Sequence, residues 1–209
     1  MAYAISQSGS SRSFPDGDSF LQNASRAANA DILVLCGATF VADSSKSAIL
    51  IELGNESLAE HIGDDCNETN VLGFARYCNG DDKPSPLVEL VRPAGASDTA
   101  VAAARDMFKM AGLEVVVSSD QIGRIINRLV LPKYNAALRF LDEGLATQQD
   151  MDLTCKLGLG YPDGPIERVV RGGLARHFDV TQALFETYGT PSYAPPRRAV
   201  VASRRKRGG

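Results

Sequence analysis

The chain has 209 residues, of which 44% are hydrophobic and 22% charged, a balance that supports a sizeable buried core and excludes wholesale disorder. The formal net charge is -3, from 22 Lys and Arg against 25 Asp and Glu, so we expect no nucleic acid as a partner. No apolar run approaches the roughly 20 residues of a membrane span, and no secretory signal opens the chain. The composition therefore predicts a cytoplasmic globular protein that binds neither nucleic acid nor a membrane.

The four cysteines are far apart, with no C-x-x-C pair and no histidine at zinc-ligand spacing. Cys36 lies in an apolar run and Cys155 in an expected helix, positions typical of small buried side chains. We therefore expect no metal site.

Residues 1–29 are polar and small, and we expect a polar N-terminal segment whose first half-dozen to dozen residues have no fixed structure and whose far end could form a short helix. Short apolar runs rich in β-branched residues follow, which favours buried strands. These runs are Ile32–Leu35, Ala48–Leu53, Val71–Phe74 and Leu87–Val91. Continuous apolar strands of this kind are typical of a parallel sheet covered on both faces.

A β–α–β unit completes this half of the chain. Ser97 opens a segment whose apolar residues fall on one helical face, Gly112 ends it, and Glu114–Val117 is a further expected strand. We expect a right-handed crossover with the helix over the sheet. Residues 30–118 therefore predict a partial α/β domain.

From residue 119 onward the apolar period is helical. Asp120 is the expected N-cap of a helix that continues to Gly144 and is kinked or restarted at Pro132. Thr147-Gln-Gln-Asp150 is close to a capping box and predicts a helix that ends at Gly158. Further helices are expected through 166–170 and over 180–188. Residues 119–190 therefore predict a helical domain.

Residues 191–209 contain six basic side chains in a polar context. One interpretation is a solvated, disordered basic tail. A second is that Val200–Gly209 is a degraded copy of the final G-R-K-x-G-x-G-F-Y segment of the family considered below, and nucleic-acid binding by this end is the least favoured.

Five separately spaced motifs lie within residues 120–165. They are Asp120-Gln-Ile-Gly-Arg-Ile-Ile-Asn-Arg-Leu-Val-Leu-Pro132, Asn135-Ala-Ala-Leu138, Glu143-Gly-Leu-Ala146, Asp150-Met-Asp152 and Lys156-Leu-Gly-Leu-Gly-Tyr-Pro-Asp-Gly-Pro165. In this order they resemble the C-terminal domain of the 3-hydroxyacyl-CoA dehydrogenase family, whose pattern is D-x-x-G-F-x-x-N-R-x-x-x-P, E-A, G-x-A, D-I-D and G-x-G-x-P-x-G-P. The resemblance implies an α/β plus all-α protein, in which a partial Rossmann-like parallel sheet precedes the family's helical domain.

Weaker matches extend upstream. The segment from Asn79 to Glu89 resembles the family's H-F-F-N-P…L-V-E, Gly54–Leu58 resembles S-N-T-S-S-L, and Ala30–Leu35 resembles its A-D-x-V strand. The preceding strands of the family, with the G-x-G-x-x-G loop that binds dinucleotide phosphates, have no counterpart, and Gly37 is expected to be a turn residue only. The chain thus resembles a 3-hydroxybutyryl-CoA type dehydrogenase, N-terminally shortened and degenerate, like the second half of long bacterial members.

The resemblance also implies site residues. In the family a histidine takes the proton of the 3-hydroxyl while hydride passes to NAD, and a glutamate orients that histidine. Carried over by position, the catalytic residues are Glu89, Asn127 and Ser57, whereas Arg76 stands at the histidine position. An arginine stays protonated and cannot accept a proton near neutral pH. NAD is the implied cofactor, but weak binding is expected.

The same residues have structural interpretations. Glu89 could be solvated at the carboxyl end of the sheet, and Asn127 could cap or bridge helices. The two histidines, His61 and His177, are expected to be surface or capping residues, with His61 as the alternative base because it follows Ser57 closely.

Two functions remain open at this point. The first is NAD-linked oxidation of a 3-hydroxyacyl-CoA in fatty-acid β-oxidation or a related route, weak or absent in the isolated chain. The second is a non-catalytic accessory or dimerisation subunit, or an acyl-CoA-binding module. The resemblance implies an acyl-CoA as substrate or ligand, and either a homodimer formed through the helical domain or a complex with a full-length dehydrogenase.

Overall fold

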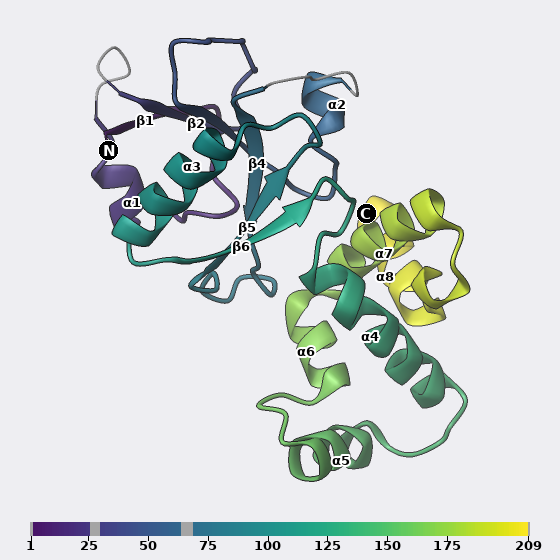
Figure 1. The fold of residues 1–209 in the computed structure, drawn as a ribbon. Helices are drawn as coiled ribbons and strands as arrows, with labels where there is room; N and C mark the ends of the chain where they lie inside the picture. The colour runs from purple at the N-terminus through teal and green to yellow at the C-terminus, as the bar shows by residue number, and fades with distance from the viewer. Residues whose placement is uncertain (1, 26–29, 64–68, 209) are drawn as a thin grey trace. The chain divides into compact units, whose positions relative to one another are not determined.

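The computed structural model describes residues 2–25, 30–63 and 69–208, which form two compact units (Figure 1). The sheet unit comprises the residues up to Cys78 together with Pro84–Arg124. The helical unit comprises Asn79–Lys83 and the residues from Ile125 onward. This division lies a few residues after the expected boundary at 118, and it assigns one short connection of the sheet to the helical unit.

Six strands form a single sheet in which they follow one another in sequence order. They are β1 (Tyr3–Gln7), β2 (Ile32–Cys36), β3 (Ala48–Glu52), β4 (Val71–Arg76), β5 (Leu87–Arg92) and β6 (Glu114–Ser119). The strands expected from residue 32 onward are confirmed. Neighbouring strands are parallel except β4 and β5, which are antiparallel, so the predicted parallel sheet is confirmed apart from this one pair. β4 and β5 are joined by residues 77–86, which contain no helix.

Both faces of the sheet are covered, which explains why its strands are apolar without alternation. One face packs Val34 and Leu50 with Phe108 of α3 (Asp98–Met110) and Phe20 of α1 (Ser19–Gln22). The opposite face buries a second cluster, which includes Leu58 immediately before α2 (Ala59–Ile62).

The N-terminal segment is part of this core, so the expectation that it has no fixed structure is wrong. β1 pairs in parallel with β2 over Tyr3–Gln7. Phe14 and Phe20 are almost fully buried, and their ring centroids lie 4.1 Å apart in a stacked arrangement. Two aromatic side chains in an otherwise polar stretch are enough to fix it, because each buries a large apolar area.

The helical unit contains α4 (Ile126–Asp142), α5 (Gln148–Leu159), α6 (Pro165–Gly172), α7 (Leu174–Tyr188), the 3-10 turn η2 (Pro191–Tyr193) and α8 (Arg197–Gly208). α4 runs through Pro132 without restarting, and Thr147 caps α5 as expected, its hydroxyl accepting from the backbone N–H of Asp150 at 3.2 Å. Asp120 does not cap α4. Its carboxylate accepts from the backbone N–H groups of Leu58 and Ala59 at the start of α2 instead.

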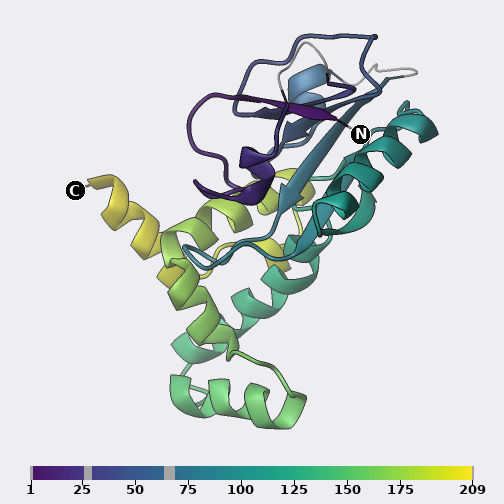
Figure 2. The same ribbon diagram turned by 90° about the vertical axis from the view of Figure 1, so that its left-hand side faces the viewer.

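The expected disordered tail is largely a helix, which corrects that prediction. α8, yellow in Figure 2, packs against α7 and buries Ala199 and Ser203. Arg198 and Arg207 pair with Asp142 and Asp179. Small residues spaced by four positions let α8 approach its neighbour although most of its other side chains are cationic.

Candidate functional site

Three of the four positions that the sequence singled out belong to the sheet unit, and Asn127 belongs to the helical unit, where it is half-buried in the first turn of α4. In the antiparallel register of β4 and β5, Glu89 lies opposite Ala75 and Arg76 lies opposite Val88. Successive side chains of a strand point to opposite faces of its sheet, whereas directly opposed ones share a face. Arg76 and Glu89 therefore lie on opposite faces, and the residue that faces Glu89 across the strands is Ala75.

Arg76 has a structural role on its own face. Its Nε donates to the carbonyl of Ser85 at 2.9 Å, and its Nη1 donates to the carbonyl of Ser13 at 2.9 Å and lies 3.5 Å from a carboxylate oxygen of Asp18. The guanidinium also lies over the ring of Phe14, 5.0 Å from its centroid. Arg76, which stands at the position of the family's histidine, therefore holds the segment between β1 and α1 against β4.

Glu89 is almost fully buried on β5, and the charged group beside it is Arg124, whose Nε lies 3.8 Å from a carboxylate oxygen of Glu89. Arg124 is itself only 7% exposed, and its Nη2 donates to the carbonyl of Gly54 at 2.6 Å. Burial lowers the pKa of Arg124, an effect that the charge of Glu89 opposes. The expectation that Glu89 is solvated at the sheet edge is therefore wrong, and this carboxylate has a cation rather than an imidazole as its charged neighbour.

Arg124 is strained and incompletely bonded. Among the described residues other than glycine, Arg124 alone has a positive φ, of 46°. Its Nε and Nη1 are buried and have no hydrogen-bond partner within the described part of the chain. The sequence signal for this residue was its place after Gly123, where the family pattern has phenylalanine; its pairing with Glu89 required the fold.

Ser57 has a local partner. Its hydroxyl and its backbone N–H donate to a carboxylate oxygen of Glu60 in α2, at 3.1 and 2.8 Å. His61, at the last turn of α2, has its Nε2 3.6 Å from Glu56 and a side chain 36% exposed.

His177 is not a surface residue, which corrects the expectation for it. It is buried on α7, and its Nε2 shares a hydrogen bond of 2.7 Å with Oδ1 of Asn135 on α4. The amide nitrogen of Asn135 donates to the carbonyl of Ser192 at 2.9 Å. Burial lowers the pKa of His177 to about 4, so this network ties α4, α7 and η2 together with an uncharged imidazole at neutral pH.

The carboxyl ends of β1–β3 are the part of the sheet where a dinucleotide would have to bind. In doubly wound sheets such a ligand binds at the carboxyl ends of strands where the strand order reverses, with its phosphates on a glycine-rich loop. Here the order does not reverse, and the segment after β1 is Ser8-Gly9-Ser10-Ser11-Arg12-Ser13-Phe14. Its hydroxyl and N–H donors at Ser11 and Ser13 are bonded to the carboxylate of Glu52. These residues do not fit the phosphates of NAD.

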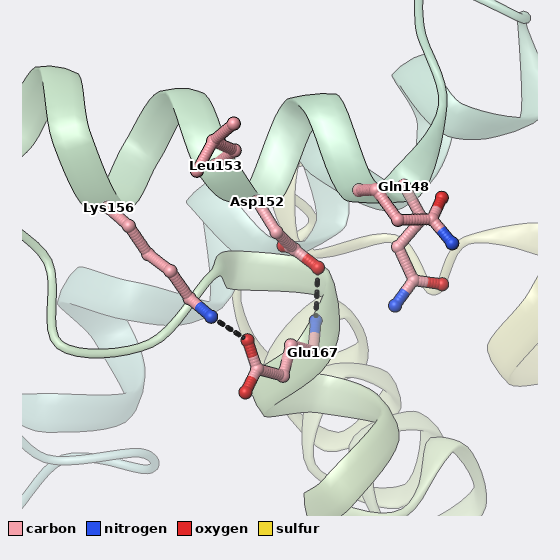
Figure 3. Close-up of a pocket in the computed structure, with 6 residues that line it drawn as sticks. Gln148, Asp152, Leu153, Lys156 and Glu167 are labelled. Carbon is pink, nitrogen blue, oxygen red and sulfur yellow. Dashed lines mark hydrogen bonds and ion pairs between the residues drawn. The ribbon is translucent and has the colours of Figure 1, made fainter.

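A pocket of about 310 Å³ lies within the helical unit, between α5 and α6 (Figure 3). Asp152 accepts there from the backbone N–H groups of Ile166 and Glu167, and Lys156 pairs with the side chain of Glu167. The carboxylate of Asp152 is thereby satisfied as a cap of α6, in agreement with a structural role for the Asp150-Met-Asp152 motif.

Within the described ranges, no group of three or more His, Cys, Asp or Glu side chains could hold a metal ion. None of the helices described there combines the length and apolar character needed to cross a bilayer.

Comparison with known proteins identifies the domain at the C-terminal end of the chain. Residues 123–207 match the family model of the 3-hydroxyacyl-CoA dehydrogenase C-terminal domain. The 3-hydroxybutyryl-CoA dehydrogenase of Mycobacterium tuberculosis is 36% identical over 113 residues, which are 53% of this chain and 39% of that protein. Its counterpart in Bradyrhizobium diazoefficiens is 34% identical over 143 residues, which are 62% of this chain and 49% of that protein.

The fold agrees with these matches. The crystal structure of M. tuberculosis FadB2 is similar over 85% of this chain and 67% of that chain, with a TM-score of 0.71 at 21% identity. The chain spans less than half the length of the two curated relatives above. The ordered motifs of the helical unit and these similarities lead to one conclusion: residues 123–207 form a 3-hydroxyacyl-CoA dehydrogenase C-terminal domain, and the chain is similar to 3-hydroxybutyryl-CoA dehydrogenases.

Proposed function

We propose that the chain is a non-catalytic member of this family, a cytoplasmic accessory and dimerisation subunit that binds an acyl-CoA of fatty-acid degradation and does not by itself oxidise a 3-hydroxyl group. The pairing of Glu89 with Arg124 carries this proposal. A general base must be able to take up a proton, and a guanidinium beside the glutamate remains charged at neutral pH. The side chain that faces Glu89 from β4 is Ala75, which has no proton acceptor.

The misfit of the carboxyl edge to NAD supports the same proposal. Without a bound nicotinamide there is no hydride acceptor, so oxidation by the isolated chain would lack both the base and the acceptor. An acyl-CoA remains the proposed ligand, because both curated relatives are named as dehydrogenases of 3-hydroxybutyryl-CoA and because Asn127 and Ser57 keep the family's residue types.

Exposed leucines support dimerisation through the helical unit. α5 buries only Asp152, while Leu157 is 79% exposed and Leu153 is 52% exposed one turn before it. Leu145, between α4 and α5, is 68% exposed. Apolar side chains gathered on one poorly buried helix are typical of a surface that a partner covers, and we propose a second copy of this chain as that partner.

The catalytic part of the proposal is tested by titrating the purified chain with NAD⁺ and with acetoacetyl-CoA in a calorimeter, and by assaying NADH formation from 3-hydroxybutyryl-CoA. Binding of acetoacetyl-CoA without binding of NAD⁺ and without NADH formation is expected. Robust NADH formation by the pure chain would refute the proposal and would make His61 the first residue to examine as a base. NADH formation that appears only after a full-length dehydrogenase is added would indicate a shared active site instead.

The dimer is tested by sedimentation velocity. Leu157→Glu places a charge on the exposed face of α5 and should convert a dimer into a monomer, whereas Val41→Glu changes an equally exposed apolar residue of the sheet unit and should leave the dimer intact. A monomeric wild-type chain, or equal effects of the two variants, would contradict dimerisation through α5.

A further inference from the structure

The segment after β1 closes over the carboxyl ends of three strands. The backbone N–H of Ser8 donates to the carbonyl of Cys36 at the end of β2, at 2.9 Å. Gly37 permits this approach, since its φ is +68° and a Cβ atom there would lie 2.6 Å from the carbonyl oxygen of Ser8. Further along, Arg76 at the end of β4 holds the carbonyl of Ser13. The segment is therefore fixed to the sheet at both of its ends.

The middle of the segment, at Ser11 and Ser13, binds the side-chain carboxylate of Glu52. A carboxylate oxygen of Glu52, at the end of β3, accepts from the hydroxyl of Ser11 at 2.8 Å and from the backbone N–H of Ser13 at 2.5 Å. The hydroxyl of Ser11 in turn accepts from the backbone N–H of Phe14 at 3.0 Å. Loops that follow the first strand of a nucleotide-binding sheet use such N–H and O–H donors on a phosphate.

The thiol of Cys36 gives a second indication that Glu52 is directed into this cluster. Burial, and after it the charge of Glu52, raises the pKa of Cys36 to about 12. The cluster therefore holds one negative charge, that of Glu52, and the thiol next to it stays protonated.

We propose that Glu52 is an internal anion that occupies the donors of the Ser8–Phe14 segment and keeps phosphate groups away from the carboxyl edge of the sheet. The inference rests on the proposed function, because it gives a physical reason why this family member would not bind a dinucleotide. Two arginines belong to this part of the chain, and each already has a carboxylate nearby: Arg76 lies 3.5 Å from Asp18, and Arg12 lies 3.8 Å from Glu56. Removal of Glu52 would free the hydroxyl of Ser11 and leave the Ser13 N–H with only the Ser11 oxygen as acceptor, at 3.2 Å, so both groups could donate to a phosphate.

Glu52→Ala provides the test, with inorganic phosphate as the probe and chloride at matched ionic strength as the reference. Phosphate should raise the Tm of this variant by about 3 °C at ten times its Kd, because a ligand of the folded state stabilises it by mass action. The wild type and Glu114→Ala, which removes an exposed carboxylate at the start of β6, should show no such rise. A folded Glu52→Ala variant that phosphate does not stabilise, or equal stabilisation of the wild type, would overturn the inference.

Glu52→Gln keeps the shape of the side chain, and it is the variant to measure if Glu52→Ala does not fold. Loss of the charge should speed hydrogen exchange of the Ser13 amide about tenfold, because hydrogen bonds to a charged acceptor are about twice as strong as neutral ones. An unchanged exchange rate would overturn the inference. NADH formation by the wild type, by contrast, would refute the proposed function whatever the Glu52 variants show.

Discussion

The two units of the molecule use their buried polar groups differently. In the sheet unit, Glu89 and Arg124 form a buried pair in which two guanidinium nitrogens have no hydrogen-bond partner among the described residues. In the helical unit, His177 and Asp152 are bonded to Asn135 and to the first N–H groups of α6. In the helical unit the buried polar side chains complete hydrogen bonds, whereas in the sheet unit a buried guanidinium is left partly unbonded.

Of the substitutions that test this comparison, Arg124→Met is expected to change the free energy of unfolding most. Removal of one partner of a buried ion pair leaves an uncompensated charge, here on Glu89, and should lower the free energy of unfolding by about 3–5 kcal/mol in urea denaturation. Arg12→Met, which removes a guanidinium with a side chain 69% exposed, should change it by about 0.5 kcal/mol or less. Adding Glu89→Gln to Arg124→Met should recover part of the loss. A cost below about 1 kcal/mol for Arg124→Met would mean that the pair is not desolvated.

The next largest effect is the pH dependence that His177 gives the helical unit. Because burial lowers the pKa of His177 to about 4 from its ordinary 6.5, the unfolded chain binds a proton at a higher pH than the folded chain does. The stability contribution is complete above pH 6.5 and should be lost between pH 6.5 and 4, by about 3 kcal/mol in total. Unfolding measured across this range in the wild type and in His177→Gln isolates the histidine, since the variant should lack this part of the slope. Parallel pH profiles of the two proteins would show that folding does not change the pKa of His177, which would contradict the shift caused by burial.

The smallest effect expected is that of Asp152→Ala, which removes the cap of α6. Loss of a side-chain cap costs roughly 0.5–2 kcal/mol, and the burial of Asp152 favours the upper end of that range. Gln149→Ala, one turn earlier on α5 and exposed, is the matched control and should have almost no effect on thermal unfolding. Equal stability of the two variants would indicate that, without the Asp152 carboxylate, water accepts from the N–H groups of Ile166 and Glu167 equally well.

Much of the secondary structure could be predicted from the sequence, and the rest depends on tertiary contacts. Apolar runs with β-branched residues predicted β2–β6, because strands buried on both faces need no alternation. β1 was missed because its apolar part, Tyr3–Ile5, is only three residues long and is followed by a polar stretch, and its partners in β2 lie almost thirty residues away. α8 was missed because its composition is that of a solvated tail, whereas the packing of Ala199 and Ser203 decides its structure.

The candidate site was predictable in its residue types and not in its pairing. The motifs pointed to Glu89, Arg76, Ser57 and Asn127, but the antiparallel register that places Arg76 on the opposite face from Glu89 follows from the sheet. The expected N-cap at Asp120 failed for a similar reason, because the N–H groups that its carboxylate accepts from belong to residues about sixty positions earlier.

The connection between β4 and β5 has a consequence for how the protein can be divided. Its residues Asn79–Lys83 belong to the helical unit, where the amide of Asn79 donates to the carbonyl of Arg168 at 3.2 Å and Asp82 pairs with Arg171. Gly80 and Gly172 allow this close contact, since a Cβ on Gly80 would lie 2.9 Å from the Cα of Gly172. A fragment that begins at Ile125 would therefore lack one of its own packing surfaces. The helical unit is therefore discontinuous in sequence, and a gene cut at the apparent domain boundary would encode it without its contribution from Asn79–Lys83.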